Sequence, residues 1–257
     1  ITRTDASKEV GLSLGSFGTR KLDAYLGFAA ESVRGSVSAM SASSDGYRAH
    51  SEARQNSAQL KLSTSGDWGR VGFFTRGFEE KAQMPSYLTP AQFAANPKAV
   101  GAYTATSDRS GGSAGIRYDR ALGDNSAFSV DVVHQTSQEK AYDTIHNNRT
   151  TLTPEFRSKL GAGTWLVGGE FYDSNANTDG GKQVGQRSQS VYAQTAQPLT
   201  KTLSLELGAR TQKVESEFQA TAAGSKTSTN ARKSGLSAAL RQQLTASTVV
   251  RAGALTG

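Results

Sequence analysis

Residues 203–210 read Leu-Ser-Leu-Glu-Leu-Gly-Ala-Arg, and this stretch decides the fold. Leu203, Leu205 and Leu207 occupy every second position, with serine, glutamate and glycine between them. Successive side chains of a β-strand point to opposite faces, so the segment predicts a strand with one apolar and one polar face. A glutamate on the second face would be costly against lipid, so we expect that face to meet water.

The same two-residue period returns along the whole chain. Apolar residues alternate with polar or small ones at 10–15, 22–28, 58–62, 128–132 and 236–240. The residues predicted to face lipid are Val10, Leu12, Leu22, Leu26, Leu60, Leu62, Val130, Leu203 and Leu205, and those predicted to face a water-filled lumen are Gln59, Lys61, Asp131 and Glu206. A series of such segments indicates an all-β protein.

The composition suits a protein without a dense core. The chain has 257 residues, 36% of them hydrophobic, with 27 glycines, no cysteine and a net charge of +7. A soluble protein of this size needs many large aliphatic residues, whereas a barrel with a wet interior needs one apolar face per strand. The lack of cysteine excludes disulfides and thiolate metal sites. Lysine and arginine are spread along the chain, so no nucleic-acid partner is expected.

Short and long connections alternate between the predicted strands. Short ones fall at 32–35, 65–69, 123–126, 161–163, 199–201 and 245–247, and long polar ones at 45–56, 81–109, 139–149, 174–187 and 214–233. Turns on one rim and loops on the other are typical of a transmembrane barrel. The pattern predicts an antiparallel transmembrane β-barrel of meander topology, here a partial barrel of about 13 strands. In the longest loop, Thr89, Pro90 and Pro97 predict a short helix.

A soluble β-sandwich, β-helix or propeller is the alternative architecture. Sandwiches place large aliphatic residues on both inner faces, and many of those positions here would be serine, threonine or glycine. The sequence shows no fixed-period repeat, which argues against solenoids and propellers. The membrane barrel is therefore the favoured prediction.

Several segments resemble the family of TonB-dependent outer-membrane receptors. The opening ITRTDASKEVGLSLGSFGTRKLDAYLGFAA (1–30) is similar to the end of that family's plug followed by the first barrel hairpin. SASSDGYRAHSEARQNSAQLKLS (41–63) resembles the next hairpin. PSYLTPAQFAANPKAVGAYTATSDR (85–109) and QSVYAQTAQPLTKTLSLELGART (189–211) are similar to later segments, in the same order.

The resemblance implies that residues 1–257 are the N-terminal part of such a receptor barrel. The family's barrel has about 22 strands and a plugged lumen, so the plug and about nine strands would be missing from this chain. Residues 1–5 would be the tail of the plug-to-barrel connection. We expect the sheet to stay open, with edges at 10–14 and 249–254.

Candidate ligand-binding residues are aromatic, basic and histidine side chains of the predicted outer loops. They are Tyr47, Arg48, His50, Tyr87, Phe93, Tyr103, Tyr142, His146 and Arg149, with Phe218 near the same rim. Aromatics and arginines are the usual anchors of recognition surfaces, and cations favour anionic ligands such as ferric chelates. The same residue types also form aromatic girdles and lipopolysaccharide contacts, and Trp68 and Trp165 beside short turns are expected in the opposite girdle.

No motif of a metal site, a catalytic nucleophile or a cofactor site occurs, so neither an enzyme nor a resident metal or cofactor is expected. The resemblance implies an outer-membrane receptor that imports a scarce metal chelate or cofactor, a ferric siderophore or cobalamin, by TonB-coupled transport. Its expected partners are outer-membrane lipid and lipopolysaccharide, the chelate, and the TonB complex through the plug. A passive porin-type channel is the alternative, and an outer-membrane enzyme barrel is a more distant one.

Overall fold

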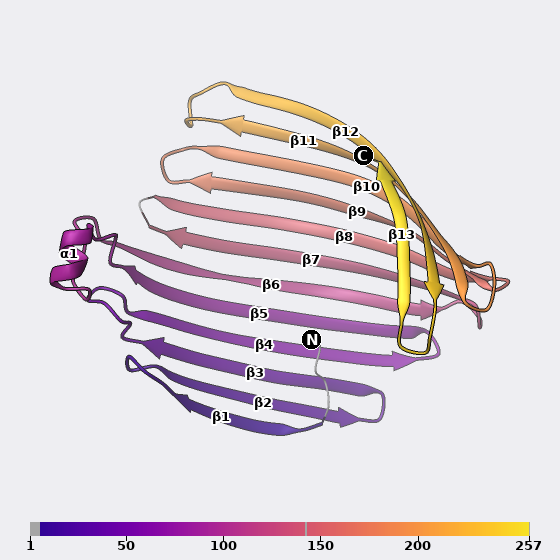
Figure 1. Ribbon diagram of the computed structural model, residues 1–257, viewed down its shortest axis with the longest axis horizontal. Helices are drawn as coiled ribbons and strands as arrows, with labels where there is room; N and C mark the ends of the chain where they lie inside the picture. Colours follow the sequence, from indigo (N-terminus) through magenta and orange to yellow (C-terminus); the bar gives the residue numbers. More distant parts are fainter. Residues whose placement is uncertain (1–5, 142, 257) are drawn as a thin grey trace.

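Most of the chain is β-strand. The computed structural model describes residues 6–141 and 143–256. Thirteen strands follow one another in a single sheet, each paired with the next (Figure 1). They are β1 (Lys8–Leu14), β2 (Arg20–Ala30), β3 (Val33–Ser44), β4 (Ala53–Gly66), β5 (Gly69–Met84), β6 (Ala105–Ala121), β7 (Ser126–Lys140), β8 (Thr144–Leu160), β9 (Gly163–Thr178), β10 (Gln183–Pro198), β11 (Leu203–Gln219), β12 (Lys226–Gln243) and β13 (Val249–Thr256). The pairs are antiparallel, which confirms the all-β meander.

The connections define two ends of this sheet. At the turn end, β2–β3, β4–β5 and β8–β9 are joined by two residues each. At the loop end, residues 85–104 form the longest connection and carry α1 (Pro90–Ala95), the one helix among the described residues. The end with the two-residue connections is called the turn end, and the end with the 85–104 connection is called the loop end.

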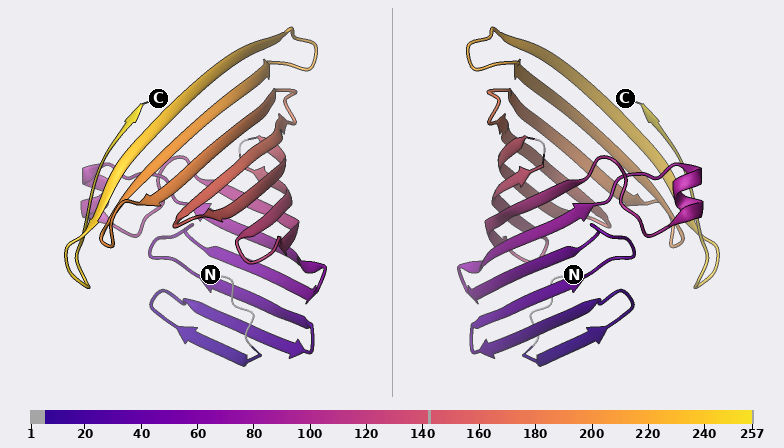
Figure 2. Two further views of the ribbon diagram at one scale, coloured as in Figure 1. Left: turned by 90° about the vertical axis from the view of Figure 1, so that its right-hand side faces the viewer. Right: turned by 90° about the vertical axis from the view of Figure 1, so that its left-hand side faces the viewer.

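The sheet is a curved, open wall (Figure 2). Its two edges are β1 and β13, and no hydrogen-bonded ladder joins them within 6–141 and 143–256. The expectation of an open sheet is confirmed. Such edges leave a row of unpaired N–H and C=O groups, which further strands would satisfy.

Strand register places the alternating residues on two distinct faces. Leu205 is opposite Leu240, and Glu206 is opposite Ala196 and Ala239. Followed strand by strand, the register puts all nine residues predicted to face lipid on one face and all four predicted to face the lumen on the other. The phase of the alternation was therefore predicted correctly.

Contacts across intervening strands identify the polar face as the concave one. Tyr192 on β10 reaches over β9 and donates a 2.9 Å hydrogen bond to Glu155 on β8. Arg251 on β13 reaches over β12 to Glu206 on β11 at 2.7 Å. Side chains converge on the inside of a curved sheet, so polar contacts of this reach indicate the lumen side.

The outer face is apolar and unshielded. The large side chains of that face are exposed, including Val10 at 79% and Leu12 at 70%, and the described residues include no buried hydrophobic side chain. A soluble sandwich would bury these residues between two sheets. The single-layer wall therefore contradicts the soluble alternative and fits a protein whose outer face meets lipid.

The predicted loop boundaries were too wide at all five long connections. The connections within 45–56, 81–109, 139–149, 174–187 and 214–233 are only 45–52, 85–104, 141–143, 179–182 and 220–225, and the rest is strand. Two of the predicted outer-loop residues, His146 and Arg149, consequently lie in β8, and Phe218 lies in β11. The sequence of these segments is polar at consecutive positions, which suggests a loop. The strands continue there because backbone hydrogen bonds join them, and these bonds do not require an apolar face. Strands of 15–18 residues are longer than the membrane requires, since about 9–11 residues cross it.

The predicted short helix is present. Thr89 caps α1 by accepting from the Gln92 N–H at 3.3 Å, and the Gln92 side chain accepts from the Thr89 N–H at 2.9 Å. This reciprocal pair satisfies two N–H groups that the helix leaves free. No helix in the described part of the chain is both long and apolar enough to span a membrane.

Neighbouring valines on β7 test the two faces. Val132 faces outward and Val133 faces the lumen. We expect Val132→Arg to lower the free energy of unfolding in lipid vesicles by about 2–4 kcal/mol, since it places a charge in hydrocarbon. Val133→Arg is the matched control and should change it far less. Urea titration of the refolded whole protein measures the free energy of unfolding of both variants. An equal loss in the two would contradict the assignment of Val132 to the outer face and Val133 to the lumen.

Candidate functional site

The lumen face is charged in different ways at its two ends. At the turn end some cations meet acids: Arg117 lies 2.6 Å from Asp131 and 2.8 Å from Asp119. Arg157 pairs with Glu155 at 2.8 Å. The charges in these pairs neutralise one another, and the Arg117–Asp131 pair joins β6 to β7. Lys61, Arg70 and Lys159 lie on the same part of the lumen face and form no ion pair with a described residue.

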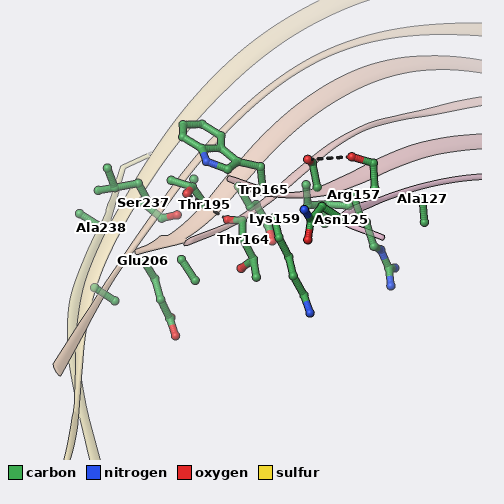
Figure 3. A pocket seen from close by; sticks show the side chains of 18 of the residues that line it. Asn125, Ala127, Arg157, Lys159, Thr164, Trp165, Thr195, Glu206, Ser237 and Ala238 are labelled. Atoms are coloured by element: carbon green, nitrogen blue, oxygen red, sulfur yellow. Dashed lines mark hydrogen bonds between the residues drawn. The ribbon is translucent and has the colours of Figure 1, made fainter. Parts of the chain in front are cut away.

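A cavity of about 1170 Å³ opens at this turn end. Figure 3 shows Arg157, Lys159 and Glu206 extending from the concave surface into it, while Trp165 lies on the opposite face of the sheet. The position of Trp165 near a short turn agrees with its predicted place in a girdle. The cavity is broad and open, as expected of one side of a barrel interior.

The loop end of the lumen carries three arginines around one cavity. Arg76, Arg109 and Arg149 line this cavity of about 640 Å³, and Glu80, which lies 3.9 Å from Arg109, is the only acid among its described lining residues. Register places Arg76, Ser113, Gln135 and Arg149 in one row across β5 to β8. Three strand spacings of about 4.8 Å put the two ends of the row roughly 14 Å apart. The name arginine row is used for Arg76 and Arg149, which lie in this row, together with Arg109, which lies four residues nearer the loops than Ser113 on β6 and lines the same cavity.

Aromatic rings hold two of these guanidinium groups in place. Arg149 lies 4.0 Å above the Tyr172 ring, and Arg109 lies 5.5 Å from the Phe78 ring centre. Tyr172 is itself fixed by a 2.8 Å hydrogen bond from its hydroxyl to Gln186. Stacking occupies the face of a guanidinium and leaves N–H groups on its edge, which are the donors that bind carboxylates in pairs.

Amides and hydroxyls surround the arginine row. Gln135, Asn147, Gln186 and Ser137 line the same cavity. Together with the guanidinium edges they present many hydrogen-bond donors to a polar, anionic ligand of several hundred Å³. The described residues contain no group of three metal-binding side chains. The arrangement can bind an anion through its oxygens.

Two of the predicted ligand residues are engaged within the loops instead. The Arg48 guanidinium donates to the Ala99 carbonyl at 2.9 and 3.0 Å and to the Ser86 carbonyl at 2.6 Å. The His50 ring lies 3.1 Å from the Ala105 carbonyl. Arg48 therefore ties the 45–52 loop to the 85–104 connection, and His50 ties it to the first residue of β6. The predicted contact of both side chains with a ligand stays a prediction.

The remaining predicted residues are distributed around the rim. Tyr87, Phe93 and Tyr103 are 74%, 59% and 72% exposed on the 85–104 connection. Tyr47 packs edge-on against Phe17 with ring centres 5.5 Å apart. Tyr142 lies outside the described residues. The structure thus brings only Arg149 of the predicted set into the arginine row.

His146 faces outward rather than into the lumen. Its Nε2 lies 3.3 Å from Asp179 in the β9–β10 turn. A hydrogen bond from Thr144, and then the one from His146, hold the pKa of Asp179 below its ordinary value. This pair belongs to the outer surface of the loop end.

Arg76 and Arg109 were missed by sequence analysis. The alternation of side chains could have predicted the facing of both. Arg76 lies on the same face of β5 as Phe78 and Glu80, and Arg109 lies on the same face of β6 as Ser113. Arg109 was instead placed at the end of a loop. The sequence signal that could have found them is an arginine on the polar face of a strand, close to the loop end.

These observations define the class of structure: a curved antiparallel sheet with an apolar outside, charged inside and polar loop end. Solved structures show the same fold. The ferric-catecholate import receptor Fiu from E. coli K12 in its open form superposes with a TM-score of 0.79 at 13% identity, over 95% of this chain and 53% of that one. The unliganded ferric citrate transporter FecA gives 0.78 at 14% identity, over 93% and 42%. The ferric yersiniabactin uptake receptor FyuA from Yersinia pestis gives 0.77 at 13% identity, over 95% and 46%.

These likenesses concern the fold. They confirm that the chain has the barrel architecture of the receptors it was predicted to resemble. The chain spans about half the length of each of the structures it matches. No protein-family model and no curated protein sequence matches the chain.

The Arg48 clamp can be tested without any ligand. Arg48→Ala removes charge-assisted hydrogen bonds, each contributing about 1.5–3 kcal/mol. We expect the 85–104 connection to be cleaved at least several-fold faster by protease added to intact cells. Arg54→Ala is the control, since Arg54 is the second residue of β4, directly after this loop, and forms no ion pair with a described residue. Unchanged cleavage in the Arg48 variant would refute the clamp.

Proposed function

We propose that residues 1–257 form the N-terminal part of the barrel of an outer-membrane receptor. This receptor imports a scarce anionic metal chelate, of the ferric siderophore class, by TonB-coupled transport. The fold shared with ferric-chelate receptors supports the proposal, as do the sequence segments that resemble the TonB-dependent family. A plug domain that engages TonB and the remaining strands complete such a receptor.

The arginine row is the observation that carries this proposal. Ferric chelates of this kind present anionic oxygens, which planar guanidinium groups bind in pairs. The row lies at the loop end, where a chelate arriving from outside the cell first meets the lumen. The exposed Tyr87, Phe93 and Tyr103 would add contacts from the rim.

The outer face supports residence in the outer membrane. An apolar surface of exposed leucine, valine and phenylalanine suits hydrocarbon, and the strands from β2 to β12 are each long enough to cross it. Transport, rather than catalysis, is the activity proposed, in line with the transport receptors that share this fold.

Energy dependence separates the receptor from the porin-type channel. Both use the same wall, but only the receptor draws on the inner-membrane proton gradient through TonB. Cells that express the whole gene are given radioactive ferric chelates with and without a protonophore, and with and without TonB. We expect accumulation to fall to background in both deprived conditions. Uptake that continues without TonB would support the passive channel instead.

Arg149→Ala tests the arginine row in the same cells. Losing hydrogen bonds to a charged donor, about 1.5–3 kcal/mol, should weaken binding of the transported chelate roughly tenfold to a hundredfold. Arg157→Ala at the turn end is the matched control, because Arg157 is already paired with Glu155. Equal affinity in the Arg149 variant and the unaltered receptor would remove the row from the binding site.

A further inference from the structure

A group of cations on the lumen face of β3, β4 and β5 has no acidic partner. Its members are Arg34, Lys61, Arg70 and Arg76. None of them forms an ion pair or a side-chain hydrogen bond with another residue of 6–141 or 143–256. Lys61 is half-buried and the three arginines are exposed. This set is named the basic track.

Acids are scarce around the basic track. β3 and β4 contain no aspartate or glutamate, and Glu80, near the loop end, is the one acid on the lumen face of β5. The next strand differs, because Arg117 on β6 lies within 2.8 Å of both Asp119 and Asp131. The wall therefore neutralises Arg117 with acids of its own, whereas it leaves the basic track charged.

Strand register spaces these cations at short intervals down the wall. Lys61 pairs with a position two residues from Arg76 on β5 and with a position two residues from Arg34 on β3. A strand spacing of about 4.8 Å and a rise of about 3.3 Å per residue put each of these neighbours roughly 8 Å from Lys61. Arg70 lies two strands from Arg34, roughly 12 Å away by the same geometry. The long side chains shorten these gaps, so an anion can meet the next cation before it leaves the previous one.

The basic track joins two cavities of the lumen face. Arg76 lines the loop-end cavity of about 640 Å³, and Arg70 lines a cavity of about 360 Å³ at the turn end. Phe74, the large side chain opposite Lys61, packs over Gly115 on β6 and so points away from Lys61. The ring therefore does not fill the space beside the middle of the track.

Apart from Arg149 of the arginine row, the other lumen cations without an ion pair among the described residues are widely spaced. Lys233 and Arg241 on β12 are eight residues apart, about 26 Å along the strand. Lys159 on β8 is four strand spacings from β12, about 19 Å. Unpaired cations thus follow one another closely on β3 to β5 and not on these strands.

We propose that the basic track is a transit binding site for the anionic metal chelate, leading it along β3, β4 and β5 from the arginine row toward the turn end. This inference rests on the proposed function. Uncompensated cations on a wall of low dielectric raise the local concentration of an anion. Passage requires sites that attract the ligand and then release it to a neighbour, and side chains without fixed partners can follow a moving ligand. Arg76 belongs to both sets, so the track begins where the chelate binds.

A thiol placed beside the basic track measures its charge without any chelate. Ser63 lies opposite Arg34 on the lumen face, and the 257 residues contain no cysteine, so Ser63→Cys provides one labelling site in this part of the receptor. The whole receptor in nonionic detergent is treated with an anionic sulfonate or a cationic trimethylammonium methanethiosulfonate. We expect the anionic reagent to react about tenfold faster, because uncompensated cations concentrate anions beside them. Taking the ratio of the two rates cancels the intrinsic reactivity of the thiol.

Matched triple variants assign this preference to the basic track. The first combines Arg34→Gln, Lys61→Gln and Arg70→Gln with Ser63→Cys, and it should bring the two reaction rates close together. The control combines Lys159→Gln, Lys233→Gln and Arg241→Gln with Ser63→Cys, which removes the same charge from other strands of the lumen face. The control should keep the preference for the anionic reagent. The same loss in both triple variants would overturn the proposal, because net charge would then attract the reagent.

Occupation of the basic track by the plug is the other outcome that would overturn the proposal. Acidic plug side chains seated on the track would give equal rates, or faster reaction with the cationic reagent, in the receptor that carries Ser63→Cys alone. A thiol that neither reagent reaches would show that the plug fills this space. Should the basic-track variant not fold, the ratio measured on Ser63→Cys alone still decides the proposal.

Uptake separates the basic track from the proposed function. Cells that express either triple variant, without Ser63→Cys, are given the radioactive ferric chelates that the unaltered receptor accumulates with TonB. The basic-track variant should bind the chelate with unchanged affinity, since the arginine row is intact, and accumulate it about tenfold more slowly. Unchanged accumulation would overturn the track as a transit site. Absence of TonB-dependent accumulation by the unaltered receptor would instead overturn the proposed function, which the thiol ratio does not measure.

Discussion

Backbone hydrogen bonding between neighbouring strands is the constraint on which the rest of this structure depends. Hydrocarbon offers no partner for N–H and C=O groups, so a chain that crosses it in extended form must pair every strand with another. The thirteen strands meet this demand with an unbroken antiparallel ladder, and only the two edges remain to be paired. Once pairing is fixed, alternation sends one side chain to lipid and the next to the lumen. The apolar outside and polar inside of the wall follow from that geometry.

Pairing also carries the sheet beyond the membrane. Strands such as β8 and β12 run for 17 and 18 residues, and their loop-end halves are polar on both faces. This extension gives the protein a stiff platform outside the hydrocarbon, where a loop would have moved freely. Arg149 lies on this extension, and both the strand and the Tyr172 ring fix the position of its guanidinium group.

Charge is distributed over this sheet in three different ways. At the turn end of the lumen, close pairs such as Arg157 and Glu155 neutralise each other. At the loop end of the lumen, Arg76, Arg109 and Arg149 face a cavity in which Glu80 is the only acid among the described lining residues. On the outside, Arg54 and Lys81 stand above the apolar surface. One sheet can therefore carry a charged lumen face and an apolar outer face, because neighbouring residues on a strand never share a face.

The sequence by itself determined the strand period, the facing of residues such as Leu205 and Glu206, the meander and the short helix. Each of these is a local property, set by side-chain alternation, by the succession of short turns and long loops, or by capping within a few residues. The tertiary structure alone decided the site. Arg76 and Arg149 lie 73 positions apart in the sequence, and only the register of four strands places them in one row. Arg48 looked free in the sequence because its carbonyl partners, on Ser86 and Ala99, come from another loop. Strand register and loop packing depend on contacts between residues that are far apart in the sequence. Alternation along a single strand does not reveal these contacts.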